Sequence, residues 1–247
     1  MNTKIKELIN KSNILLEILD ARFPKLCRIK YIEKYIKDKN KDLILVLNKS
    51  DLVSEDFLKK VVEEFSREYI TVYISAIYRK GSRKLRKAIK KVGKKYEKAY
   101  IGVFGYPNTG KSSIINLLVG RRSAGTSPKP GFTKHLQIIK LSKKYYLIDS
   151  PGIVETKNKY LLTILGAYDV DKLEHPEKAV LYLYKKIGKK PFEEYYNINI
   201  ENIKDLFIKL REKYNIKKDS DWIKRVSKII LYDWQKGKIK AFFFDAV

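Results

Sequence analysis

Two short polar stretches carry residue types and spacings that could bind a guanine nucleotide. Residues 105–112 read GYPNTGKS, and residues 48–51 read NKSD. The glycines of the first stretch would let successive backbone N–H groups point at phosphate oxygens. The carboxylate that ends the second stretch could accept from two N–H groups of guanine, whereas adenine would leave it unpaired. Both stretches need secondary structure that holds them in place.

The stretch 105–112, here called the phosphate loop, follows an apolar strand pattern at 99–105 and precedes a helical pattern, SSIINLLVG. Strand, glycine-rich loop and helix are the context that this motif requires. We predict that Lys111 bridges the β- and γ-phosphates and that the Ser112 hydroxyl binds magnesium. A glycine turn before a helix is the simpler alternative. The nucleotide contacts predicted in this segment are Asn108, Thr109, Gly110, Lys111, Ser112 and Ser113.

A later segment, YYLIDSPG at 145–152, ends an apolar strand pattern with a carboxylate. We predict that Asp149 binds magnesium and that the Gly152 N–H meets the γ-phosphate; DSPG as an ordinary turn is the alternative. Between the two segments, Thr133 is the candidate threonine that binds magnesium only when the γ-phosphate is present, with Thr126 as the alternative. The predicted catalytic residues are Lys111, Thr133 and Gly152.

The NKSD stretch follows the apolar run LILVL, where a parallel sheet delivers binding residues. Asp51 would select guanine, Asn48 would hold the loop and approach N7, and the Lys49 stem could pack on the base. About 25 residues later, a second strand pattern ends in Ser75 and Ala76, which would present a backbone N–H to the guanine oxygen. NKSD alone is weak evidence, since Asn, Ser and Asp are common in turns.

Apolar, β-rich runs alternate with helical patterns through the first two thirds of the chain. The strand patterns are 14–21, 42–49, 69–76, 99–105, 135–141 and 145–150. This alternation predicts an α/β fold, with a mostly parallel sheet flanked by helices. Only helical patterns follow, at 158–167, 176–187, 202–214 and 221–234. We predict two domains, 1–165 and a smaller α-helical domain at 166–247.

The order NKSD, SA, GYPNTGKS, GFT, DSPG resembles that of the circularly permuted GTPases, in which the base-reading motif precedes the phosphate loop. The chain looks like a member of the YlqF/RbgA family, and DARFP at 20–24 is similar to that family's DARxP segment. The resemblance implies a P-loop GTPase fold in permuted order, GTP or GDP with magnesium as ligands, and a role in assembly of the large ribosomal subunit. With a single cysteine, the chain lacks the cysteine-rich zinc module of relatives that resemble YqeH.

Ile153 occupies the position where many GTPases carry a glutamine that orients water. We therefore expect slow GTP hydrolysis in isolation and stimulation by ribosomal particles. The alternative is an RNA-binding placement factor that uses GTP as a lock with little hydrolysis. Asn108 matches the asparagine that helps to bind potassium in potassium-dependent relatives; a plain turn residue is the alternative there. An ATP-dependent P-loop enzyme is disfavoured by Asp51 with Ala76.

The chain carries 54 Lys and Arg against 28 Asp and Glu, so its partner is expected to be a polyanion. Residues 78–98 hold eleven basic residues and one acidic residue, Glu97, whereas a merely solvated helix face mixes both signs. We predict that this helix contacts phosphates of ribosomal RNA or of a large-subunit precursor. We also predict that the α-helical domain at 166–247 docks on ribosomal RNA or the ribosome, and that bound GTP sets this docking through Thr133 and the DSPG loop. The predicted RNA contacts are Arg83, Lys84, Arg86, Lys87, Lys90, Lys91, Lys94 and Lys95.

No apolar run approaches the roughly 18 residues of a membrane span. One cysteine, Cys27, excludes a disulfide within the chain. We expect a cytoplasmic protein with no membrane partner, monomeric when it is off the ribosome.

Overall fold

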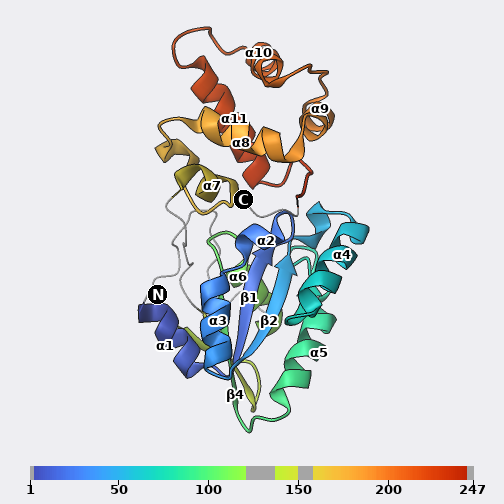
Figure 1. Ribbon diagram of the computed structural model, residues 1–247, viewed down its shortest axis with the longest axis vertical. Coiled ribbons are helices and arrows are strands. Elements are labelled where there is room, and N and C mark those ends of the chain that lie inside the picture. The colour runs from blue at the N-terminus through green and yellow to red at the C-terminus, as the bar shows by residue number, and fades with distance from the viewer. Residues whose placement is uncertain (1–2, 121–136, 150–157, 244–247) are drawn as a thin grey trace. The chain divides into compact units, whose positions relative to one another are not determined.

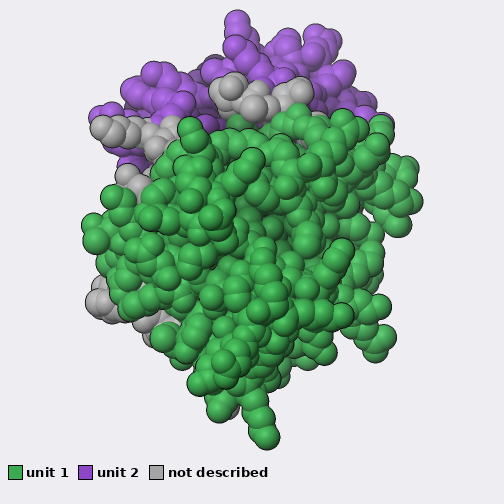
Figure 2. Space-filling model, turned by 60° about the horizontal axis from the view of Figure 1, so that its bottom comes forward, with its two compact units in different colours: residues 1–155, 244–247 green, residues 156–243 purple. Residues whose placement is uncertain are grey.

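The structure is a computed structural model, and it describes residues 3–120, 137–149 and 158–243 (Figure 1). The chain divides into two compact units, residues 1–155 with 244–247 and residues 156–243 (Figure 2). The expected boundary near residue 165 lies at the end of α7 (Lys159–Ile164), which belongs to the second unit because it packs against α8 and α11. Within the described ranges, no helix is both long and apolar enough to cross a membrane.

The first unit is built on a six-stranded sheet in the order β3-β2-β1-β4-β6-β5. The strands are β1 (Ile14–Asp20), β2 (Asp42–Asn48), β3 (Ile70–Tyr73), β4 (Ala99–Phe104), β5 (Gln137–Lys140) and β6 (Tyr145–Asp149). Every neighbouring pair is parallel except β5 and β6, which are antiparallel. The predicted mostly parallel sheet is confirmed.

Helices cover both faces of this sheet (Figure 1). On one face, α5 and α6 close a core with the apolar side chains of β1, β2 and β4, such as Ile18, Val46 and Val103. On the other, α1 packs on β4 and α3 on β2. The helices of this unit are α1 (Thr3–Lys11), α2 (Pro24–Cys27), α3 (Lys30–Asp38), η1 (Ser50–Leu52), α4 (Glu55–Ser66), α5 (Ser82–Gly93) and α6 (Lys111–Val119).

The strand predicted at 69–76 ends three residues early, at Tyr73. The chain turns there because Gly81 has a left-handed backbone, and a Cβ on it would lie 2.5 Å from the Tyr73 carbonyl oxygen. Ser75 and Lys80 exchange two backbone hydrogen bonds of 3.1 Å across the turn. Residues 74–81 thus form a tight loop between β3 and α5.

The second unit is helical, as expected, and consists of α7, η2 (Val170–Lys172), α8 (Pro176–Ile187), α9 (Lys190–Tyr196), α10 (Ile203–Lys213) and α11 (Trp222–Gln235). Trp234 of α11 is fully buried, and its indole N–H donates to the Ile164 carbonyl of α7 at 2.9 Å. Helix α9 was not predicted from the sequence, because its seven residues are too few for a helical period to show.

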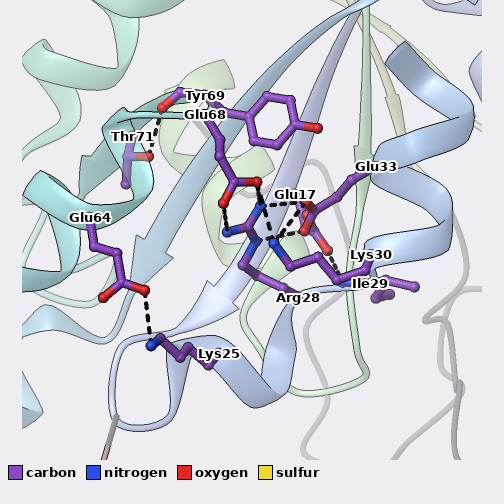
Figure 3. A network of polar contacts seen from close by, with 10 residues as sticks. All are labelled: Glu17, Lys25, Arg28, Ile29, Lys30, Glu33, Glu64, Glu68, Tyr69 and Thr71. Carbon is purple, nitrogen blue, oxygen red and sulfur yellow. Dashed lines mark hydrogen bonds and ion pairs between the residues drawn. The ribbon is translucent and has the colours of Figure 1, made fainter. Parts of the chain in front are cut away.

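A buried polar network ties α3 and α4 to β1 (Figure 3). The Arg28 guanidinium lies 2.5 Å from the Glu33 carboxylate and 2.8 Å from that of Glu68, and it stacks over the Phe65 ring. Glu17, in the middle of β1, accepts from the Ile29 N–H at 2.7 Å. We call Glu17, Arg28, Glu33 and Glu68 the Arg28 network.

Candidate nucleotide site

Asn48, the last residue of β2, joins the three loops that the sequence analysis assigned to the nucleotide. Its side-chain amide donates to the Thr109 carbonyl of the phosphate loop at 2.8 Å, and its oxygen accepts from the Ala76 N–H at 3.2 Å. The side chain is buried. The two stretches that are 57 residues apart in the sequence are therefore in direct contact, and the predicted role of Asn48 in holding the loop agrees with these contacts.

The phosphate loop has the close approaches that glycine permits. A Cβ on Gly110 would lie 2.1 Å from the Asn48 amide nitrogen, and one on Gly105 would lie 2.5 Å from the Ile18 carbonyl oxygen. Both glycines have positive φ, of 97° and 141°. A side chain at Gly110 would displace the Asn48 amide, and one at Gly105 would collide with the backbone of β1.

Lys111 begins α6 with its side chain folded into this loop. Its buried ammonium donates to the carbonyl oxygens of Tyr106 and Gly105, at 2.8 and 3.2 Å. Thr109 supports the same turn through its hydroxyl, which donates to the Tyr106 carbonyl at 3.0 Å. A cation held among backbone dipoles beside a helix start suits a phosphate group, and the contact of Lys111 with the β- and γ-phosphates stays a prediction.

The base-reading side of the site is a pair of linked loops. The Ser75 hydroxyl donates to Asp51 Oδ1 at 2.5 Å and lies 3.4 Å from the Tyr78 N–H, which donates to it. The Ser50 N–H donates to the Ile74 carbonyl at 3.1 Å. The Asp51 side chain is exposed and therefore accessible to a base. Since the Ala76 N–H already serves Asn48, it could meet a guanine oxygen only as a shared donor.

The sequence analysis gave no role to Asp20 and Arg22, which the structure places at the same edge. Asp20 ends β1 opposite Asn48 on β2, and its buried carboxylate lies 2.7 Å from the Lys49 ammonium and 2.8 Å from the Arg22 guanidinium. Burial alone would raise the pKa of Asp20, but the charges and hydrogen bonds of Arg22 and Lys49 outweigh it and hold that pKa well below its usual range. The DARFP segment thus anchors the lysine of NKSD.

The magnesium side of the site is described in part. Ser112 and Ser113 lie half-buried in the first turn of α6. The backbone of β6 ends at Asp149, in register with Val103, two residues before the phosphate loop begins. Thr133 and Gly152 lie outside the described residues. Within the described part of the chain, no three His, Cys, Asp or Glu side chains are grouped as a metal site. The predicted magnesium ligands Ser112 and Asp149 are a hydroxyl and a carboxylate, groups that magnesium binds together with water and phosphate.

The eight basic residues predicted to contact RNA are all exposed on and just after α5. Three of them are engaged within the protein. Arg86 donates to the Leu117 and Leu118 carbonyls that end α6, at 3.0 and 2.9 Å, and Lys95 pairs with Asp42 at 2.9 Å. The Lys84 ammonium donates to the Tyr73 hydroxyl at 3.2 Å. Five others have no carboxylate partner among the described residues, and these are Arg83, Lys87, Lys90, Lys91 and Lys94.

Comparisons with known proteins agree with this geometry. The family described as "50S ribosome-binding GTPase" matches residues 100–217. An uncharacterized GTP-binding protein of Methanocaldococcus jannaschii is 37% identical over 98% of this chain and 66% of its own length. Nucleolar GTP-binding protein 2 of Saccharomyces cerevisiae is 34% identical over 97% of this chain and 52% of its own. The chain spans between half and two thirds of these relatives.

Among solved structures, the GNP-bound YlqF of T. maritima superposes with a TM-score of 0.68, at 25% identity, over 96% of this chain and 95% of that one. A P-loop in front of α6, an NKxD loop after β2 and a mostly parallel sheet define a P-loop GTPase fold whose strands follow a circularly permuted order. The chain belongs to the circularly permuted GTPases of the YlqF type.

Proposed function

We propose that this protein binds GTP and GDP with magnesium, hydrolyses GTP, and acts in ribosome assembly through contact with ribosomal RNA of the large subunit. The observation that carries the proposal is the position of Asn48, which holds the phosphate loop and the Ser75–Ala76 loop together. The names of the relatives support it: they are GTP-binding proteins, and the matched family is described as ribosome-binding.

Guanine selectivity rests on Asp51. Its carboxylate is exposed and is oriented by the Ser75 hydroxyl, so it can accept from a base with two adjacent N–H donors. Asp51→Asn replaces an acceptor by a donor and should lower GTP affinity about a hundredfold or more while improving binding of xanthosine triphosphate. Titration with labelled GDP in competition with GTP, ATP and xanthosine triphosphate measures this. Asp56→Asn, an exposed aspartate five residues away in α4, is the matched control. Unchanged GTP selectivity in Asp51→Asn would refute the base-reading assignment.

Hydrolysis is proposed to be slow without a partner, because Ile153 cannot polarise water. Single-turnover hydrolysis with and without large-subunit particles, in potassium and in sodium, tests this. Stimulation by the particles supports the enzyme, whereas none under any condition favours the GTP lock. Stimulation by potassium that Asn108→Ala removes would support a potassium ion at Asn108, whose φ of 60° is also typical of a turn asparagine.

The α5 face is proposed to bind RNA because most of its cations lack a carboxylate partner among the described residues. The paired variant Lys87→Gln with Lys91→Gln should weaken RNA binding and flatten its salt dependence, since each lost phosphate contact lowers the slope by about 0.7–0.9. Lys185→Gln with Lys186→Gln, on α8 of the second unit, is the control for equal charge loss. Crosslinking of the GTP-bound protein to cellular RNA would identify the RNA.

We also propose that this protein is a cytoplasmic monomer when it is off the ribosome.

A further inference from the structure

The loop that follows the base-reading Ser75–Ala76 carries two exposed apolar side chains side by side. Ile77 is 79% exposed and Tyr78 is 64% exposed, the two highest values for large hydrophobic residues in the described part of the chain. Exposed apolar side chains that adjoin one another and are surrounded by polar residues are typical of contact sites. The Tyr78 hydroxyl has no hydrogen-bond partner among the described residues.

Hydrogen bonds fix the backbone of the loop that exposes Ile77 and Tyr78. The Tyr78 N–H donates to the Ser75 hydroxyl, and Ser75 and Lys80 close the loop with two hydrogen bonds of 3.1 Å. Arg79 adopts a left-handed backbone with φ of 55°, and its carbonyl accepts from the Ser82 hydroxyl at 3.3 Å. Because the loop is closed on itself, Tyr78 can bind a partner without a large loss of backbone entropy.

The surroundings of Tyr78 are positively charged. Arg79 and Lys80 follow it directly, and Arg83 and Lys84 are exposed on the first turn of α5, which contains no acidic residue. None of these four cations has a carboxylate partner among the described residues. An aromatic ring among cations suits an unpaired nucleobase, which stacks on the ring while its neighbouring phosphates meet Arg and Lys.

We propose that residues 77–80, the Tyr78 loop, bind single-stranded RNA, with Tyr78 stacked on an unpaired base and Arg79 and Lys80 on the flanking phosphates. This rests on the proposed RNA function and adds to it a site and a class of RNA. A protein partner would be a poorer match, because four clustered cations would then need a similarly dense acidic surface.

The test is fluorescence anisotropy of a short, labelled single-stranded RNA of mixed sequence, and of the same sequence as a duplex, with the full chain. Tyr78→Ala should weaken single-strand binding about tenfold or more and leave duplex binding and the salt slope unchanged, while Tyr78→Phe retains stacking and binds as the wild type does. Arg79→Gln with Lys80→Gln should instead reduce the salt slope. Tyr31→Ala, which removes a 42% exposed tyrosine on α3, is the matched control.

Equal binding of Tyr78→Ala and wild type to single-stranded RNA would overturn the Tyr78 loop proposal. If the α5 variants still lost affinity, the proposed RNA function would stand without it. Equal losses on duplex and single strand would also overturn stacking. Failure of the wild type to bind any RNA would refute the RNA function itself. Labelled-GDP binding by Tyr78→Ala, expected to match the wild type, verifies that the variant is folded.

Discussion

Two buried carboxylates lie three residues apart on β1 and have opposite electrostatic surroundings. Asp20, at the carboxyl end, is one carboxylate between two cations, Arg22 and Lys49. Glu17, in mid-strand, belongs to the Arg28 network, where the carboxylates outnumber the buried cations (Figure 3). Both carboxyl groups are fully buried, so the number of cations within contact distance accounts for the opposite directions of their pKa shifts.

The surroundings of Glu17 favour its protonated form. Burial and the neighbouring Glu33 carboxylate raise the pKa of Glu17 well above its usual range, against the hydrogen bond from Ile29. Its second oxygen has no partner among the described residues, and a proton shared with Glu33 would complete that contact. The hydrogen bond from Arg28, in contrast, lowers the pKa of the outer Glu68 to about 2. The surroundings of Asp20 favour the charged carboxylate beside the nucleotide loops, whereas those of Glu17 favour the protonated carboxyl group within a packed layer.

Removing the central cation should have the largest effect on stability. Arg28→Met deletes the partner of buried Glu33. Among the described residues this leaves Lys30, 3.8 Å away, as the one cation near Glu33, so the free energy of unfolding should fall by about 3–5 kcal/mol. Urea unfolding measures this. Arg67→Met, which breaks an exposed pair with Glu63, should cost at most about 1 kcal/mol. Nucleotide affinity of the folded Arg28→Met protein should be unchanged. A large loss of affinity would show that the Arg28 network is coupled to the contacts of Asp20 with Arg22 and Lys49.

Asp20→Asn tests the other side of the comparison. The amide keeps the shape but removes the negative charge that Asp20 places beside buried Arg22, so stability should fall by about 1.5–3 kcal/mol. Lys49 also loses its anchor, and affinity for GDP and GTP should fall severalfold and equally. Asp56→Asn is the control. Wild-type nucleotide affinity in Asp20→Asn would show that Asp20 contributes to stability and not to nucleotide binding.

The pH dependence of Asp20 follows from its lowered pKa. A carboxyl group that binds protons less readily when folded contributes its full stabilisation above its unfolded pKa, near 4, and loses it as the pH falls further. Asp20→Asn should therefore remove part of the acid destabilisation that we expect for the wild type below about pH 4. Unfolding midpoints in urea across the acid range measure this slope.

The elements that have a clear local sequence pattern could be predicted from the sequence. The apolar run of β2, the glycines of the phosphate loop and the period of α11 predict those elements and their bounds to within a residue or two. Even the contact between NKSD and the phosphate loop could be expected, because parallel strands end at one edge of the sheet.

The missed roles depend on register and on long-range pairing. The place of Asp20 beside Lys49 follows only from the pairing of Asp20 with Asn48 across β1 and β2. Similarly, Arg28 meets a glutamate that lies 40 residues away on the chain. Polar residues in such positions look like strand ends or loop charges until the neighbouring strand and helix are known, although DARFP directly after a strand was a usable signal for Asp20.

The smallest effect on stability is expected for Glu17→Gln. Its pH dependence should have the opposite sign to that of Asp20→Asn. Because the folded pKa of Glu17 is raised, its protonated form contributes stability that is present below the unfolded pKa, near 4.3, and is lost as the pH rises through the folded value. Glutamine stays neutral, can still accept from the Ile29 N–H, and can donate to Glu33. The variant should be close to wild type at pH 5 and neutral to about 1 kcal/mol more stable at pH 8. A Glu17→Gln protein that loses stability as the pH rises, in parallel with the wild type, would place the titrating proton elsewhere in the Arg28 network, with Glu33→Gln as the variant to compare.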